Sequence, residues 1–304
     1  DQLMGKPLPV AAVSALFDTL GPRKQKAAAR QIQLLVDTPA RVIEMGKLAR
    51  TGQITLRSDL EIDVGLHRGG MEAGLALDAA LSHLAQTPNL ELSGLMGYEP
   101  HLSKLPKLAG WRRRARAGAV SAYVAARAQV AQYYSPAQIE KMTFNTAGSP
   151  TFGLYTAVEH ANEISAGSAL VKPSDFDLPL LQGFEPAAFI ATPALKVSQG
   201  VRLPALEHAN NLLGKTQSGS TIFIHGGYWM AQAVFPPRLK NSALFGRSSN
   251  QEMLVGPTQL KLSVDDFVFL RPNQSEAVFL QFPKIAVFDG RRIADIWQPL
   301  PVSA

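Results

Sequence analysis

The stretch Leu60-Glu-Ile-Asp-Val-Gly-Leu-His-Arg-Gly-Gly-Met71 decides the fold class of this chain. Apolar and acidic side chains alternate up to Val64, which is the two-residue period of a β-strand. Gly65 ends the strand, and a charged, glycine-rich tip with His67 and Arg68 follows. A parallel strand buried on both faces avoids alternating acids, whereas inward residues near the carboxyl end of a barrel strand face an active site. The pattern therefore predicts the catalytic rim of a (β/α) barrel; a surface strand with a polar turn is the alternative interpretation.

Strand-like and helix-like segments alternate on both sides of this stretch. We expect strands at 2–9, 31–40, 90–98, 142–146 and 163–171. We expect helices at 10–20, 24–30, 41–51, 72–86, 121–134 and 136–141. Alternation at this spacing requires parallel strands joined by right-handed crossovers. The first part of the chain is therefore predicted to be α/β.

After Pro173 the pattern changes to short strands separated by turns. We expect these strands at 189–197, 221–228, 252–255, 258–262, 267–270, 277–282 and 285–288, with one helix at 205–213. The chain is thus predicted to hold a barrel domain over 1–180 and a mainly-β domain over 181–304.

Composition narrows the classes of function. The 304 residues include no cysteine, which excludes disulfides, thiol nucleophiles and thiolate metal sites and favours a reducing, cytoplasmic location. No uncharged apolar run is long enough to span a membrane. The net charge is +6, but residues 100–139 carry seven Lys or Arg and no acid, so the rest sums to −1. Because no aromatic interleaving accompanies these charges, a solvated helix start is favoured and no nucleic-acid partner is predicted.

Two loops of small residues follow predicted strands. The first is Thr146–Thr151, and the second contains Gly167 and Ser168. Such loops expose backbone N–H groups, and Thr or Ser hydroxyls add donors, which together suit a phosphate group. Ordinary turn chemistry is the alternative for each loop taken alone.

Other polar side chains at strand ends are candidate catalytic or metal-binding groups. Tyr98 and His101 close a strand at the same rim and are suitable general acids or bases, or else surface residues. Gln274 and Glu276 lie two apart between strands of the β domain, so their oxygens would share a strand face and suit a hard cation. An exposed polar edge is the alternative there.

Four ordered motifs resemble the D-threonine aldolase / D-serine dehydratase family: 61–70, 94–101, 145–151 and 163–168. The resemblance covers essentially the whole chain. It implies an alanine-racemase-like (β/α)8 barrel, incomplete in this chain, that is followed by a C-terminal β domain at the barrel mouth. It also implies pyridoxal 5'-phosphate as cofactor, a D-amino acid as substrate and a homodimer.

Matched residue by residue, the resemblance assigns Arg68 to the cofactor pocket, where it tunes the cofactor. Tyr98 and His101 match the family's Tyr-x-Gly-His strand end, with Pro100 in place of glycine, and are expected to position or shuttle protons. The phosphate-holding segments of the family match Thr146, Ala147, Gly148, Ser149, Gly167 and Ser168.

The chain departs from the family at two places. Where the family has a His-x-Cys or similar metal-binding pair, this chain has Gln274 and Glu276, whose oxygens suit manganese or magnesium better than zinc. The family's Schiff-base lysine lies on the first barrel strand. Because 2–9 matches the third strand, we expect about two strands and this lysine to precede Asp1.

The resemblance implies a pyridoxal-phosphate-dependent lyase that acts on 3-hydroxy-D-amino acids by aldol cleavage or by loss of water. An amino-acid racemase of the same fold, which needs no metal, is one alternative. A non-catalytic cofactor-binding protein without the lysine is the other.

Overall fold

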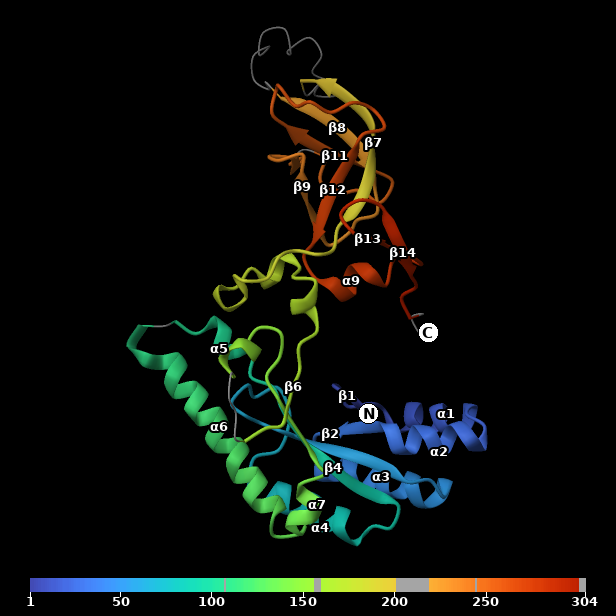
Figure 1. Ribbon diagram of the computed structural model, residues 1–304, viewed down its shortest axis with the longest axis vertical. Helices are drawn as coiled ribbons and strands as arrows, with labels where there is room; N and C mark the ends of the chain where they lie inside the picture. The colour runs from blue at the N-terminus through green and yellow to red at the C-terminus, as the bar shows by residue number, and fades with distance from the viewer. Residues whose placement is uncertain (107, 156–159, 201–218, 244, 301–304) are drawn as a thin grey trace. The chain divides into compact units, whose positions relative to one another are not determined.

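The computed structural model describes residues 1–106, 108–155, 160–200, 219–243 and 245–300. They form two compact units, Asp1–Gly167 and Ser168–Ala304 (Figure 1). The predicted helix at 205–213 lies outside the described residues. No helix in the described part of the chain has the length and apolar character needed to cross a membrane.

The first unit is built on a sheet of six parallel strands in sequence order. The strands are β1 (Gln2–Met4), β2 (Ile32–Val36), β3 (Leu56–Ile62), β4 (Leu90–Gly97), β5 (Thr143–Thr146) and β6 (Glu163–Ile164). The helices are α1 (Val10–Thr19), α2 (Pro22–Gln31), α3 (Pro39–Gly52), α4 (Leu75–Gln86), α5 (His101–Lys104), α6 (Trp111–Val130) and α7 (Pro136–Ile139). Each crossover joins neighbouring parallel strands, and the sheet of described residues stays open at β1 and β6. The predicted incomplete (β/α) barrel is confirmed.

Local sequence explains where these elements begin and end. At the start of α3, Pro39 occupies the first turn and the Thr38 hydroxyl accepts a hydrogen bond from Arg41 N at 3.3 Å. The helix ends where Gln53 adopts a left-handed conformation, with φ of 51°. These two end residues set the bounds of α3, and β3 begins soon after Gln53, at Leu56.

The two faces of this sheet differ in chemistry. One face is apolar, with Leu34, Leu60 and Phe144, and is covered by α1, α3, α4 and α6 (Figure 1). The other carries polar side chains that include Gln33 and Asp59. This division follows from the two-residue period of strands, and it directs the polar residues of the sheet away from the helices.

The second unit is mainly β, as predicted. Six antiparallel strands lie in the order β10-β11-β8-β7-β12-β9. They are β7 (Ile190–Gln199), β8 (Ser220–His225), β9 (Ala231–Phe235), β10 (Lys240–Asn241), β11 (Gln251–Gly256) and β12 (Phe267–Pro272). A separate hairpin pairs β13 (Ile285–Phe288) with β14 (Ile293–Trp297), and α9 (Ser275–Phe279) precedes it. The strand core is apolar, with Ile222, Leu254 and Val268 fully buried.

Three predicted strands are wrong. The segment 277–282 lies largely in α9 and the turn after it, because a short apolar run has no period that separates helix from strand, and Glu276 favours the first turn of a helix. The segment 258–262 is irregular. Of 163–171 only Glu163–Ile164 is strand, since the small residues that follow lack side chains to pack in a sheet.

Candidate functional site

The connection between β3 and α4 folds back onto the end of β3. Met71 N donates to Glu61 O at 2.8 Å, and Asp63 N donates to Met71 O at 3.1 Å. Gly70 has φ of 92°, and a Cβ there would lie 2.8 Å from Asp63 N, so this return requires glycine. The Asp63 carboxylate accepts hydrogen bonds from Gly65 N and His67 N, which fixes the turn between strand and loop. The charged tip of the connection is therefore held in one place.

Three of the predicted site residues meet at the ends of neighbouring strands. The guanidinium of Arg68 lies over the Tyr98 ring, 5.0 Å from its centroid. Gly148 lies against the same ring, since a Cβ on Gly148 would be 2.3 Å from Tyr98 Cε2. The aromatic ring thus contacts a cation from the β3 end and backbone from the β5 end.

Glu61 adds a carboxylate near this contact. It is half-buried, and burial together with the nearby charge of Asp37 raises its pKa, against the opposing effect of Arg68. A Cβ on Gly69 would lie 3.8 Å from Glu61 Oε2. Glu61 and Arg68 therefore interact electrostatically near the end of β3.

The carboxylate of Glu99 organises the loop after β5. It accepts hydrogen bonds from Thr151 Oγ1 at 3.0 Å and from Thr146 Oγ1 and Ala147 N at 3.4 Å. Glu99 is almost fully buried, and burial raises its pKa in spite of these bonds. Two donors predicted to face a phosphate, on Thr146 and Ala147, therefore point to Glu99 instead. Sequence reasoning gave Glu99 no role; a carboxylate at a strand end, opposite a threonine-rich loop, was the available signal.

The second small-residue loop is tied to the first. Gly167 N donates to Ser149 Oγ at 2.9 Å, which joins the chain after β6 to the chain after β5. Ser168 belongs to the second unit, where its hydroxyl donates to Glu276 Oε1 at 3.0 Å and accepts from Ser275 Oγ at 3.2 Å. Ser149 and Gly167 thus lie together at the β6 edge of the first unit.

The predicted metal pair has a different geometry from that expected. Gln274 precedes α9 and donates from Nε2 to Asp175 Oδ2 at 3.2 Å. Glu276 lies in the first turn of α9, so the predicted shared strand face is wrong, because side chains two apart at a helix start point in different directions.

His101 faces a cavity on the α6 side of the β3–α4 connection. The cavity has a volume of about 560 Å³ and is lined by Asp63, His67, Glu72, His101 and small residues of α6. A Cβ on Gly65 would lie 3.7 Å from His101 Nε2. Burial and the neighbouring His67 lower the pKa of His101. The contacts of His101 are thus distinct from the Arg68–Tyr98–Gly148 contact.

A buried acid on β3 was also missed by sequence reasoning. Asp59 is fully buried, and Ser93 Oγ donates to its Oδ1 at 2.5 Å. Its Oδ2 has no hydrogen-bond partner among the described residues. Burial raises the pKa of Asp59 to about 7, so the group binds a proton through most of the acidic range.

Comparison with known proteins identifies the fold. A family model described as "Alanine racemase, N-terminal domain" matches residues 11–175. D-threonine aldolase from Filomicrobium marinum is 16% identical, with a TM-score of 0.68 over 97% of this chain and 80% of that one. D-threo-3-hydroxyaspartate dehydratase from Delftia sp. HT23 is 16% identical, with a TM-score of 0.69 over 98% and 78%. Alanine racemase of Clostridium difficile 630 is 12% identical, with a TM-score of 0.66 over 97% and 78%.

These structural likenesses, at such low identities, establish the fold alone. They confirm the predicted alanine-racemase-like architecture. No curated protein sequence matches the chain.

Proposed function

Because the chain belongs to the family of alanine racemase N-terminal domains, we propose that it binds pyridoxal phosphate and acts on 3-hydroxy-D-amino acids as a lyase. Two of the structurally similar proteins, a D-threonine aldolase and a D-threo-3-hydroxyaspartate dehydratase, are named for substrates of this class. Cleavage of the Cα–Cβ bond and loss of water are the two reactions that a 3-hydroxyl group on the substrate allows.

The observation that carries the proposal is the meeting of Arg68, Tyr98 and Gly148. Arg68 supplies a cation at the carboxyl ends of parallel strands, where active sites of barrels lie. The lack of a side chain on Gly148 lets backbone approach the Tyr98 ring. A cation, an aromatic ring and closely approaching backbone suit a flat coenzyme with an anionic tail.

The predicted phosphate-binding residues fit pyridoxal phosphate to different degrees. Gly148 and Ser149 would hold the phosphate, and Gly167 would position the Ser149 hydroxyl through the hydrogen bond that its N–H donates. Thr146 and Ala147 would act indirectly, since their donors bind Glu99 and thereby fix the shape of the loop. Ser168 stays a prediction as a phosphate ligand.

Pyridoxal phosphate, when bound, supplies an electron sink for the charge that develops at Cα of an amino acid. Arg68 would orient the coenzyme by its positive charge and balance its anionic groups. Tyr98 would hold one face of the site through its ring. The expected role of His101 in shuttling a proton stays a prediction, because its side chain lines the cavity beside His67, whose lining does not include Arg68 or Tyr98.

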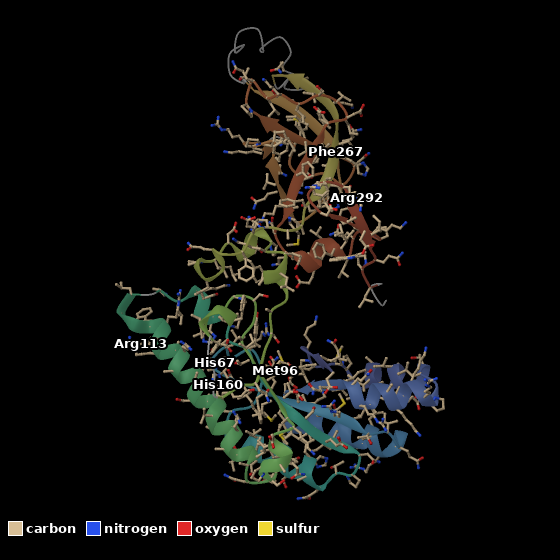
Figure 2. The ribbon with its side chains drawn as sticks, in the orientation of Figure 1. His67, Met96, Arg113, His160, Phe267 and Arg292 are labelled. Carbon is tan, nitrogen blue, oxygen red and sulfur yellow. The ribbon has the colours of Figure 1, made fainter. Side chains whose placement is uncertain are left out.

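The proposal is tested by titrating the chain with pyridoxal phosphate while following the absorbance of the coenzyme and the tryptophan fluorescence of the protein. We expect saturable binding, weakened at least about tenfold in Arg68→Ala, because a charge-assisted contact to an anion is lost. Arg113→Ala, which removes an exposed arginine of α6 (Figure 2), should bind like the wild type. Equal binding by wild type and Arg68→Ala, or no binding at all, would contradict the proposed site.

The products formed from D-amino acids distinguish aldol cleavage, loss of water and racemisation. In a protein that also holds the expected Schiff-base lysine, incubation with D-threonine and D-serine should yield an aldehyde with glycine, or a keto acid with ammonia. Racemisation of D-alanine without either lyase reaction would favour the racemase alternative. Coenzyme binding without turnover of any of the three would favour the non-catalytic alternative.

A further inference from the structure

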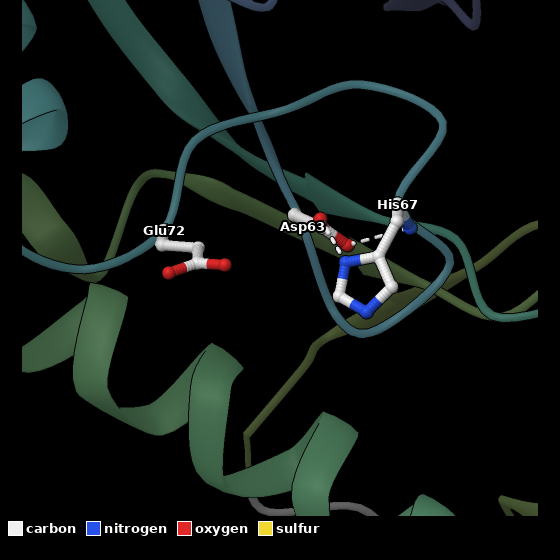
Figure 3. Close-up of side chains that lie close together, drawn as sticks. All are labelled: Asp63, His67 and Glu72. Atoms are coloured by element: carbon white, nitrogen blue, oxygen red, sulfur yellow. Dashed lines mark hydrogen bonds and ion pairs between the residues drawn. The ribbon is translucent and has the colours of Figure 1, made fainter.

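Three side chains with possible metal-ligating atoms line the cavity of about 560 Å³, whose lining includes neither Arg68 nor Tyr98. Asp63, His67 and Glu72 each offer one donor atom, and these atoms lie within 4.8 Å of one another (Figure 3). They form the sole group of three such side chains found in the described part of the chain. We propose that Asp63, His67 and Glu72 bind a divalent transition-metal ion of the zinc class, a site that goes beyond the proposed function and does not depend on it.

The β3–α4 connection holds His67 in place for this role. Asp63 Oδ1 accepts from Gly65 N at 2.9 Å and from His67 N at 3.1 Å, and Asp63 Oδ2 lies 2.8 Å from His67 Nδ1. Asp63 thus brings a carboxylate oxygen next to the imidazole of His67, as two ligands of one ion require.

Glu72 contributes a carboxylate whose negative charge is not balanced by a partner among the described residues. Its side chain is exposed, and no hydrogen bond or ion pair of Glu72 occurs among the described residues. Figure 3 shows its carboxylate directed toward Asp63 and His67. Two carboxylates that converge on one imidazole repel each other, and a divalent cation between them would relieve that repulsion.

The spacing of the donors suits a small ion. Zinc binds imidazole nitrogen and carboxylate oxygen at about 2.0–2.2 Å, so donors that share one ion lie at most about 4.4 Å apart. A separation within 4.8 Å therefore needs only a small rotation of the exposed Glu72 side chain. The mixed nitrogen and oxygen set favours a transition metal over magnesium, which prefers oxygen alone.

The surroundings leave room for a fourth ligand. The α6 side of the cavity is lined by small residues, among them Gly118, where an added Cβ would meet no atom within 4 Å. His101 lines the same cavity, and its buried Nδ1 has no hydrogen-bond partner in the described residues. A water molecule or a small ligand thus has space to complete the coordination.

The test is isothermal titration of the chain with Zn²⁺, together with the visible spectrum of bound Co²⁺, which reports a nitrogen-containing tetrahedral or five-coordinate site. One ion should bind per chain, and Mg²⁺ should not compete. Glu72→Gln changes an exposed side chain and should weaken Zn²⁺ binding at least about tenfold, as should His67→Ala. Asp63→Asn replaces a charged ligand by a neutral one and should also weaken Zn²⁺ binding at least about tenfold.

Two matched controls separate this site from general binding to surface side chains. His225→Ala removes an exposed histidine of the second unit, and Glu276→Gln removes the acid of the previously predicted metal pair. Both should bind Zn²⁺ like the wild type. The inference would be overturned if the wild type did not bind Zn²⁺, or if Glu72→Gln and His67→Ala bound it as tightly as the wild type. It would also be overturned if His225→Ala or Glu276→Gln lost Zn²⁺ binding. Because the probe is the metal alone, failure here is distinct from failure of pyridoxal phosphate to bind.

Discussion

Replacing Asp59 by asparagine removes a carboxyl group whose proton is retained by the folded protein. In the unfolded chain the pKa of this group is 3.8, and burial raises it to about 7 in the folded state. Between these values the folded protein binds one more proton than the unfolded chain, so the free energy of unfolding falls as pH rises. About three pKa units at 1.36 kcal/mol each correspond to about 4 kcal/mol of stability that is present near pH 4 and lost near pH 7.

Asp59→Asn has no titration in this range and still offers an oxygen to the Ser93 hydroxyl. We therefore expect urea unfolding at about pH 5 and about pH 8 to show a smaller loss of stability for the variant than for the wild type. Asp18→Asn, at an exposed position of α1, is the matched control and should keep the wild-type pH dependence. If Asp59→Asn and wild type lose the same stability between the two pH values, then Asp59 is ionised in the folded protein and the reasoning is refuted.

Two further substitutions examine the loop after β5. Gly148→Ala places a Cβ 2.3 Å from Tyr98 Cε2, which should lower the free energy of unfolding by about 1–3 kcal/mol and weaken pyridoxal phosphate binding. The control Gly21→Ala, whose added Cβ would meet no atom within 4 Å, should change neither. Equal melting temperatures and equal coenzyme affinities of the two variants would argue against the close approach of Gly148 to Tyr98. Thr151→Val removes the 3.0 Å hydrogen bond from the Thr151 hydroxyl to the buried Glu99 and should cost about 1–3 kcal/mol in urea unfolding. A wild-type midpoint would mean that the stability does not depend on that hydrogen bond.

Much of the architecture could be predicted because it depends on periodicity. Alternation of apolar strands and amphipathic helices is enough to require parallel pairing, and β1 to β6 lie in sequence order. The contact of Arg68 with Tyr98 could be predicted for the same reason, since both residues follow strand ends that parallel pairing places at one edge of the sheet. The strand predicted at 277–282 failed because only tertiary context separates a short apolar strand from a short helix.

The side-chain network of the site was less predictable. The side chain of Glu99 is buried and accepts a hydrogen bond from the Thr151 hydroxyl. This contact depends on the backbone path of the loop and not on the spacing of the residues in the sequence. The group of Asp63, His67 and Glu72 likewise arises where the β3–α4 connection folds back at Gly70. Composition and spacing show which donors exist, whereas the direction of each donor is set by turns with unusual backbone angles.

The most direct test of the proposed coenzyme site is a crystal structure of the chain grown with pyridoxal phosphate. We predict coenzyme density in contact with the Arg68 guanidinium and against Tyr98, with the phosphate beside Gly148 and Ser149. Coenzyme bound elsewhere, or Arg68 and Gly148 both apart from the Tyr98 ring, would contradict the account.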